Sequence, residues 1–346
     1  LLAATLVVTS TAGGPPVGSA VTLAAPELRV RLDDGRLLLT GAQRFSLAAV
    51  EGGAAERLGF TQLAAEAAAS TRPYAIDAPG TGSVVRIGQA GVAGGDITVS
   101  GAIRAHSGIQ FTSGSGSGLL AVTLTPSGLL ETLAGGMRLD PAGRFELRGE
   151  LVARGSDADI VIAARDTLEL HGSLTAQRDI VIGAGTRVAE GERSIATFGT
   201  SRLTTLDAGG RIVVDGLNDV HIDSRIGAGN PGLSLVQLTS RQGLLTVAAE
   251  SGVVETGAAI EISGRDVRIE GRIGSLVATP VAFDDEVSVR ANRDAWIGGD
   301  WALAGSVLLS AGDDLAIAGT TLRADAAGQR LTLQAGDRLD IGDAAR

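Results

Sequence analysis

The sequence predicts an all-β protein, a right-handed parallel β-helix with about 20 residues per coil. Residues 287–343 repeat one unit three times, as VSVRANRDAWIGG, VLLSAGDDLAIAG and LTLQAGDRLDIGD. Segments such as ELHGSL and LTLQ alternate apolar and polar residues, which is the strand period rather than the helical one. One such unit cannot bury its own apolar face, so we expect the units to stack and form a continuous core.

Equivalent positions in the three copies carry similar residues. An apolar strand residue (Val289, Leu309, Leu333) is followed eight residues later by isoleucine (Ile297, Ile317, Ile341). With 44% hydrophobic residues, 3% aromatic residues and 50 glycines, the composition favours a core of stacked aliphatic side chains over a compact aromatic-rich enzyme core.

An acidic residue precedes the strand in most copies. These residues are Asp96, Asp159, Asp166, Asp179, Asp219, Asp266, Asp294 and Asp314. The steps 159 to 179 and 294 to 314 are both 20 residues, so we expect Asp294 and Asp314 to be neighbours on successive coils. A stacked pair of carboxylates could act as acid and base on a glycan. Recurrence at many positions favours instead a structural role, hydrogen bonding to the turn backbone. Longer steps predict loops that bulge from single coils, within 234–252 and 276–286.

Three regions are predicted along the chain. Residues 1–27 form leading strands that continue from a missing upstream part, joined by a Pro/Gly loop. Residues 28–85 form an α+β insertion, with a hairpin at Asp34-Gly35 and a short helix around 53–69. Residues 86–346 form the β-helix, which we expect to continue beyond the fragment.

Charge and composition restrict the classes of partner. Every basic residue is Arg, and the net charge is −10. An acidic surface repels phosphate backbones, which argues against a nucleic-acid partner. Cysteine is absent, so we expect neither disulfides nor a thiolate site. The apolar run at the start, LLAATLVV, is too short to span a bilayer, and we expect no transmembrane segment in this fragment.

No catalytic, cofactor or metal site is predicted. His106, His171 and His221 lie 65 and 50 residues apart, each without a second ligand at metal spacing, and we expect them at the surface. The segment GAGNPG at 227–232 fits G-x-G-x-x-G, but a strand follows where a dinucleotide-binding helix is required. The acidic run at 284–286 is interpreted as a solvated loop rather than a Ca²⁺ site.

The two tryptophans, Trp296 and Trp301, are the candidate glycan contacts. If Ile297 points inward, alternation directs Trp296 outward, where an aromatic ring could stack on a sugar. The alternative interpretation is a pair of rim residues that cover a neighbouring loop.

The run SVLLSAGDDLAIAGTTLRADAAGQRLTLQAGDRLDIGD resembles the haemagglutinin-type repeats of filamentous-haemagglutinin-like bacterial exoproteins, many of them secreted by two-partner systems. The resemblance covers about residues 145–343. It implies a β-helical shaft, an extracellular or cell-surface location, and attachment to a receptor or glycan on a host or neighbouring cell. It also implies an outer-membrane transporter for secretion. The family's secretion domain carries Asn-Pro motifs, and here only Asn230-Pro231 occurs, in mid-chain, so we expect that this fragment lacks that domain.

We therefore expect a non-enzymatic structural shaft or adhesive module, with recognition by the irregular insertions 28–85, 186–206 and 230–258. One alternative is a glycan-binding or glycan-cleaving β-helix, which needs a single-copy charged cluster in a groove with aromatic residues nearby. A second alternative is a phage tail-fibre or spike segment, which we would expect to trimerise.

Overall fold

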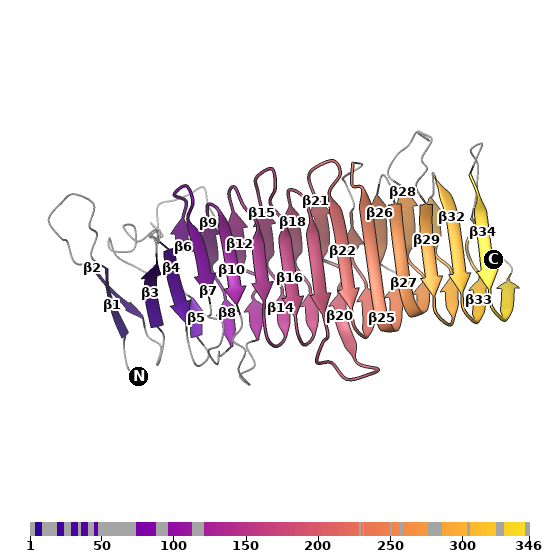
Figure 1. Cartoon of the computed structure of the whole chain (residues 1–346), viewed down its shortest axis with the longest axis horizontal. Coiled ribbons are helices and arrows are strands. Elements are labelled where there is room, and N and C mark those ends of the chain that lie inside the picture. Colours follow the sequence, from indigo (N-terminus) through magenta and orange to yellow (C-terminus); the bar gives the residue numbers. More distant parts are fainter. Residues whose placement is uncertain are drawn as a thin grey trace. The chain divides into compact units, whose positions relative to one another are not determined.

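The chain is an all-β parallel β-solenoid of about 9 turns with about 24 residues per turn, as described by a computed structural model. The structure describes residues 4–8, 19–23, 29–33, 36–40, 45–47, 74–87, 96–112, 121–227, 230, 232–249, 251–256, 259–275, 286–302, 305–322 and 329–342, with strand positions only before residue 76. The chain divides into two compact units, Leu1–Ala158 and Asp159–Arg346. The strands within each unit can be followed in Figure 1.

The first unit contains fifteen of the described strands. They are β1 (Ala4–Val8), β2 (Ser19–Leu23), β3 (Arg29–Asp33), β4 (Arg36–Thr40), β5 (Phe45–Leu47), β6 (Tyr74–Ala78), β7 (Val84–Ile87), β8 (Ile97–Val99), β9 (Ala102–Ala105), β10 (Gly108–Thr112), β11 (Val122–Leu124), β12 (Leu129–Thr132), β13 (Met137–Asp140), β14 (Phe145–Leu147) and β15 (Glu150–Ala153).

The second unit contains the remaining strands. They are β16 (Ile160–Ala164), β17 (Leu168–Leu170), β18 (Ser173–Ala176), β19 (Ile180–Ala184), β20 (Arg193–Thr197), β21 (Arg202–Thr205), β22 (Arg211–Gly216), β23 (Asp219–Ile222), β24 (Arg225–Ile226), β25 (Leu235–Val247), β26 (Val253–Thr256), β27 (Ala259–Ile269), β28 (Arg272–Ser275), β29 (Glu286–Ala291), β30 (Ala295–Ile297), β31 (Asp300–Ala302), β32 (Ser306–Ala311), β33 (Asp314–Ile317), β34 (Leu331–Ala335) and β35 (Arg338–Ile341).

The N-terminal strands include the two leading strands predicted in 1–27 and the hairpin predicted at Asp34-Gly35. β1 pairs antiparallel with β2, and β3 pairs antiparallel with β4, leaving Asp34 and Gly35 between the paired residues Asp33 and Arg36. β4 and β5 also pair in parallel with β7 and β8. The helix predicted around 53–69 lies outside the described residues, and the predicted domain boundaries remain predictions.

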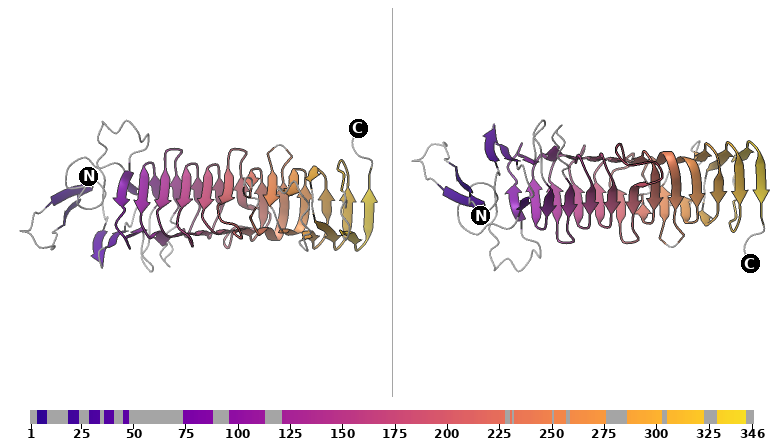
Figure 2. Two further views of the ribbon diagram at one scale, coloured as in Figure 1. Left: turned by 90° about the horizontal axis from the view of Figure 1, so that it is seen from above. Right: turned by 90° about the horizontal axis from the view of Figure 1, so that it is seen from below.

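Each coil of the second unit contributes up to three strands, which pair in parallel with the same three strands of the next coil. The strands β19, β20 and β21, for example, pair with β22, β23 and β24 in that order. Both views in Figure 2 show successive strands of this unit lying side by side. We call the three stacks of strands face a, face b and face c, in chain order. In β25 and β27 the chain passes from face a to face b within one long strand.

The step from coil to coil varies, because the loops at the corners differ in length. On face a, Ile160 pairs with Ile180 after 20 residues, and Ile180 pairs with Ile212 after 32. Val236 pairs with Ile260 after 24 residues. The predicted step of about 20 residues thus occurs between only some of the coils, and the average is about 24.

Aliphatic side chains at alternate positions fill the core in stacked columns. The predicted equivalences hold, since Ile297 pairs in register with Ile317 and Ile317 with Ile341. Val289, Leu309 and Leu333 stack in the same way on face a. Val289, Leu309, Ile297 and Ile317 are buried, whereas Ile341 is 64% exposed. Burial of such columns coil after coil supplies the hydrophobic stabilisation that a single coil lacks.

The two predicted irregular segments have different outcomes. Residues 186–206 begin in a long corner between β19 and β20, which lengthens this coil, and continue as the in-register strands β20 and β21. The prediction was wrong for 230–258, of which the in-register strands β25 and β26 are part. Within the predicted loop 234–252, residues 235–247 form β25, which pairs on faces a and b rather than bulging from the coil. Residues 276–285 lie outside the part of the chain that the structure describes.

Candidate binding surface

The recurring aspartates occupy two positions in the coil, not one. Asp159 and Asp179 come before strands of face a, whereas Asp219, Asp266, Asp294 and Asp314 come before strands of face b. Residue 244 stands at the face b position between 219 and 266, and there the residue is Leu. Because leucine replaces the repeated aspartate at this position, the aspartate pattern of the sequence does not reveal this coil.

Five of these carboxylates, those of Asp159, Asp179, Asp219, Asp266 and Asp294, accept a hydrogen bond from a backbone N–H of the next coil. Asp159 Oδ1 accepts from the backbone N–H of Asp179 at 3.1 Å, and Asp179 Oδ1 accepts from that of Arg211 at 2.9 Å. On face b, Asp294 Oδ1 accepts from the N–H of Asp314 at 3.3 Å. The expected structural role is therefore confirmed, with the acceptor bridging coils rather than closing its own turn.

Arginines beside these turns offset the repulsion between stacked carboxylates. Arg211 Nη2 lies 2.7 Å from Asp179 Oδ2, and Arg293 Nη2 lies 3.0 Å from Asp266 Oδ2. Hydrogen bonding to these carboxylates raises the pKa of both arginines. The arrangement repeats along the coils, as expected for a structural device.

The structure directs Trp296 outward, as alternation predicts. Its neighbours on β30, Ala295 and Ile297, are buried, while Trp296 is half-buried. The guanidinium carbon of Arg268, on the preceding coil, lies 5.2 Å from the indole centroid. Arg268 Nε in turn donates to Glu270 Oε1 at 2.8 Å. The ring is thus held in a cation–π contact by an arginine that is itself anchored.

Small residues surround the indole on its other sides. A Cβ at Gly298 would stand 2.5 Å from the nearest atom of the six-membered ring, so only glycine allows the indole to lie there. Ala316 occupies the equivalent outward position on the following coil. We call Arg268, Glu270, Trp296, Gly298 and Ala316 the Trp296 surface.

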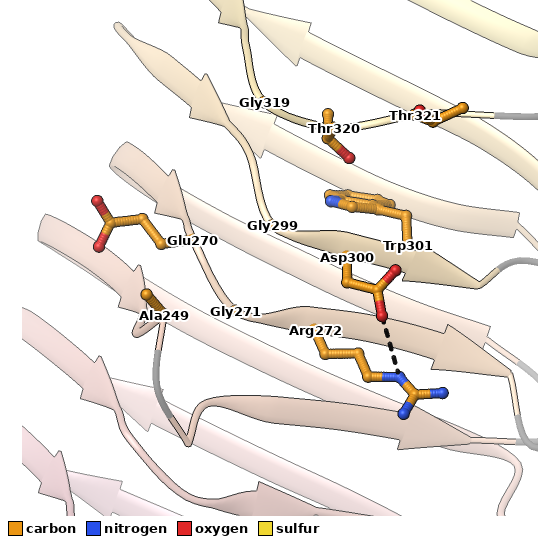
Figure 3. Close-up of a pocket in the computed structure, with 10 residues that line it drawn as sticks. All are labelled: Ala249, Glu270, Gly271, Arg272, Gly299, Asp300, Trp301, Gly319, Thr320 and Thr321. Atoms are coloured by element: carbon orange, nitrogen blue, oxygen red, sulfur yellow. Dashed lines mark ion pairs between the residues drawn. The ribbon is translucent and has the colours of Figure 1, made fainter. Parts of the chain in front are cut away.

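A groove of about 820 Å³ adjoins this surface through Glu270, which lines it. Its lining residues are Ala249, Glu270, Gly271, Arg272, Gly299, Asp300, Trp301, Gly319, Thr320 and Thr321, and we call it the Gly299 groove. Figure 3 shows Glu270 on one side of the glycines and Arg272, Asp300 and Trp301 on the other. Gly271, Gly299 and Gly319 have no side chain to fill this corner of successive coils.

Close packing of coils requires the glycine at the centre of the groove. Gly299 has φ of 79°, and a Cβ there would lie 2.0 Å from the carbonyl oxygen of Gly271. Gly319 also has a positive φ, of 69°. Any L side chain at Gly299 would therefore be strained and would push the coils apart.

Charged side chains line the groove wall. Arg272 Nε lies 3.7 Å from Glu255 Oε1 and 3.9 Å from Asp300 Oδ2, distances of ion pairs rather than hydrogen bonds. The side chain of Asp300 is 81% exposed and that of Arg272 is 46% exposed, whereas Glu255 is buried. Arg272 thus lies between two carboxylates. The oxygens of Asp300 remain largely able to accept hydrogen bonds from solvent or a ligand.

Trp301 lies in the core column of face c and is only 9% exposed. It pairs with Ile273 in a column that otherwise holds Leu, Ile and Val. Its Nε1–H donates to the carbonyl oxygen of Gly298 at 2.7 Å. Trp296 and Trp301 therefore lie on different faces of the coil, and only Trp296 presents its ring outward.

The histidines lie at half-buried positions. His171 stacks on Phe198, with ring centroids 3.9 Å apart, and His106 Nδ1 lies 3.0 Å from Ser107 Oγ. His221 points outward from β23, as alternation predicts. Burial, assisted by Arg193, lowers the pKa of His221.

No family model, no curated protein and no solved structure matches this chain. Among the described residues, the structure has no helix with the length and apolarity needed to cross a membrane. The acidic run 284–286 lies largely outside the described residues, where only Glu286 is placed, at the start of β29.

Proposed function

We propose that this chain is a structural shaft and adhesive module of a large bacterial surface or secreted exoprotein, which mediates attachment or cell–cell contact without catalysis. The observation that carries the proposal is the repetition of one bonding scheme from coil to coil. Parallel backbone ladders, aliphatic columns and bridging aspartates recur at equivalent positions of the second unit. A load-bearing support needs such uniformity, whereas a catalytic site is needed only once.

The resemblance of residues 306–343 to haemagglutinin-type repeats supports the same function. On this basis the proposal includes a location outside the cell or on its surface, with a receptor or glycan of a host or neighbouring cell as partner. Secretion through an outer-membrane transporter belongs to this proposal.

Adhesion can be tested directly with beads that carry the purified chain. We expect these beads to bind cultured epithelial cells or bacterial cells several-fold more than albumin-coated beads of equal size. Binding no higher than albumin on every cell type would contradict the adhesive role. A trimer in analytical ultracentrifugation would favour the phage-fibre alternative.

A second candidate function, glycan binding, is favoured by the Trp296 surface. An outward indole held by Arg268, beside a groove lined with carboxylates and hydroxyls, is an arrangement suited to sugars. Release of reducing ends from a polysaccharide would show instead that the chain cleaves glycans.

A further inference from the structure

We propose that the Trp296 surface and the Gly299 groove form one binding site for a neutral oligosaccharide. This inference deepens the glycan-binding function proposed above and rests on it. Glu270 links the two parts, because it accepts from Arg268 and lines the groove.

Trp296 offers one face of its indole to a ligand. Arg268 stands on the preceding coil and covers one face of the ring, at 5.2 Å from the centroid. Ala316 stands on the following coil at the equivalent outward position, and its methyl group leaves the opposite face without a large neighbour. A flat apolar face of this kind packs against the C–H face of a pyranose ring, with polar groups at its margin.

The groove supplies polar groups for sugar hydroxyls. Asp300 is 81% exposed and lies beyond hydrogen-bond distance of Arg272, so its oxygens can accept from hydroxyl groups. Arg272 and Thr321 are exposed donors on the same wall. The glycine floor permits close approach of a ligand to the backbone.

The charge balance selects a neutral ligand. Glu270 and Asp300 line the groove and the buried Glu255 lies beside Arg272, which makes three carboxylates against the two guanidinium groups of Arg268 and Arg272. Arg268 is bonded to Glu270, and Arg272 lies between two carboxylates. The chain as a whole has a net charge of −10. An acidic glycan would meet repulsion from these carboxylates, and among the described residues of the site the only two cations are already placed beside them.

The length of the groove selects an oligosaccharide rather than a single sugar. Its lining residues come from four successive coils, represented by Ala249, Gly271, Gly299 and Gly319. Coils stack at the strand spacing of about 4.8 Å, so the groove extends about 14 Å along the stack. Several sugar units can therefore contact it at once.

Calorimetric titration of the whole chain tests the inference. The neutral probes are maltohexaose, cellohexaose and chitohexaose, and the acidic probes are hexagalacturonate and sialyllactose. We expect at least one neutral probe to bind and the acidic probes to bind at least tenfold more weakly. Preference for an acidic probe, or binding of none, would overturn the inference.

Two substitutions locate the site. Trp296→Ala removes the platform, and Ala316→Leu covers its open face while leaving the tryptophan in place. We expect each to weaken binding of the neutral probe at least tenfold. The matched controls are Ala163→Leu, at an outward position of face a, and Arg241→Ala, which removes another arginine paired with a surface carboxylate, Asp215. If both site variants bind the probe unchanged, or if the controls lose binding equally, the probe does not bind at the Trp296 surface.

The outcome is separable from that of the adhesive role. If Ala316→Leu abolishes sugar binding while coated beads still adhere, the saccharide site stands and the adhesive contact lies elsewhere. If neutral sugars bind and beads never adhere, the adhesive proposal fails alone.

Discussion

Asp219 Oδ1 accepts a 2.8 Å hydrogen bond from the backbone N–H of Leu244, the residue that occupies the same position one coil later. Gly243 precedes this N–H, and a Cβ there would stand 2.3 Å from the same carboxylate oxygen. Carboxylate and backbone thus approach closely because the turn residue is glycine. The contact joins two coils at a place where the repeated aspartate is interrupted.

Asp219→Ala should lower the free energy of unfolding by about 1–3 kcal/mol, because the N–H of Leu244 loses a charged acceptor. Asp219→Asn keeps an acceptor oxygen and should cost less. Urea denaturation followed by circular dichroism measures both. Glu261→Ala, at an exposed outward position of β27, is the control and should change stability by less than about 0.5 kcal/mol. An Asp219→Ala loss as small as that of the control would contradict the bridging role.

Gly299→Ala should destabilise the chain more than Gly209→Ala. Both glycines have positive φ, 79° and 87°, so both substitutions carry a backbone strain of about 1–2 kcal/mol. Only at Gly299 would the new Cβ also collide with the carbonyl of Gly271, whereas no atom lies within 4 Å at Gly209. Thermal melts of the two variants provide the comparison. Equal melting temperatures would show that the coils can separate at this corner without cost.

The two tryptophans should differ in their contribution to stability. Trp301→Ala removes a buried side chain from the core column of face c and should cost about 3–5 kcal/mol. Trp296→Ala removes an outward ring and its contact with Arg268, and should cost no more than about 1 kcal/mol. Urea midpoints of the two variants report the difference. A larger loss for Trp296 would mean that its ring supports the fold rather than a ligand.

The fold could be predicted because inward positions repeat a simple chemistry. Val289, Leu309 and Leu333 stack in register, as the alignment of the three copies indicates. The number of coils was harder to predict, because the most visible marker was aspartate. Where Leu244 stands in place of this aspartate, the sequence pattern predicts a loop, although the structure has the strand β25. Asp179 and Asp219 also looked equivalent, although they lie on different faces.

The candidate site was predictable only in part. Alternation within β30 gives the direction of Trp296 once Ile297 is placed inside. Trp301 follows the corner Gly298–Gly299, where the chain changes face, so alternation cannot be carried across to it. The groove depends on Gly271, Gly299 and Gly319 reaching the same corner after steps of 28 and 20 residues. Because the spacing is unequal, a search of the sequence for one fixed period does not align these three glycines.

His221 should make stability fall as the pH is lowered through 6.5, the ordinary pKa of histidine. Burial and Arg193 lower the pKa of His221 below its ordinary value of 6.5, against the opposing influence of Asp223 and Glu270. Between the lowered folded pKa and 6.5, the unfolded state binds more protons, so stability falls as pH falls. His221→Gln should flatten this part of the profile, because glutamine does not titrate. Urea denaturation of both proteins at pH 7.5, 6.5 and 5.5 measures the slopes, with His106 and His171 common to both. Identical slopes would show that His221 is as well solvated in the folded chain as in the unfolded one.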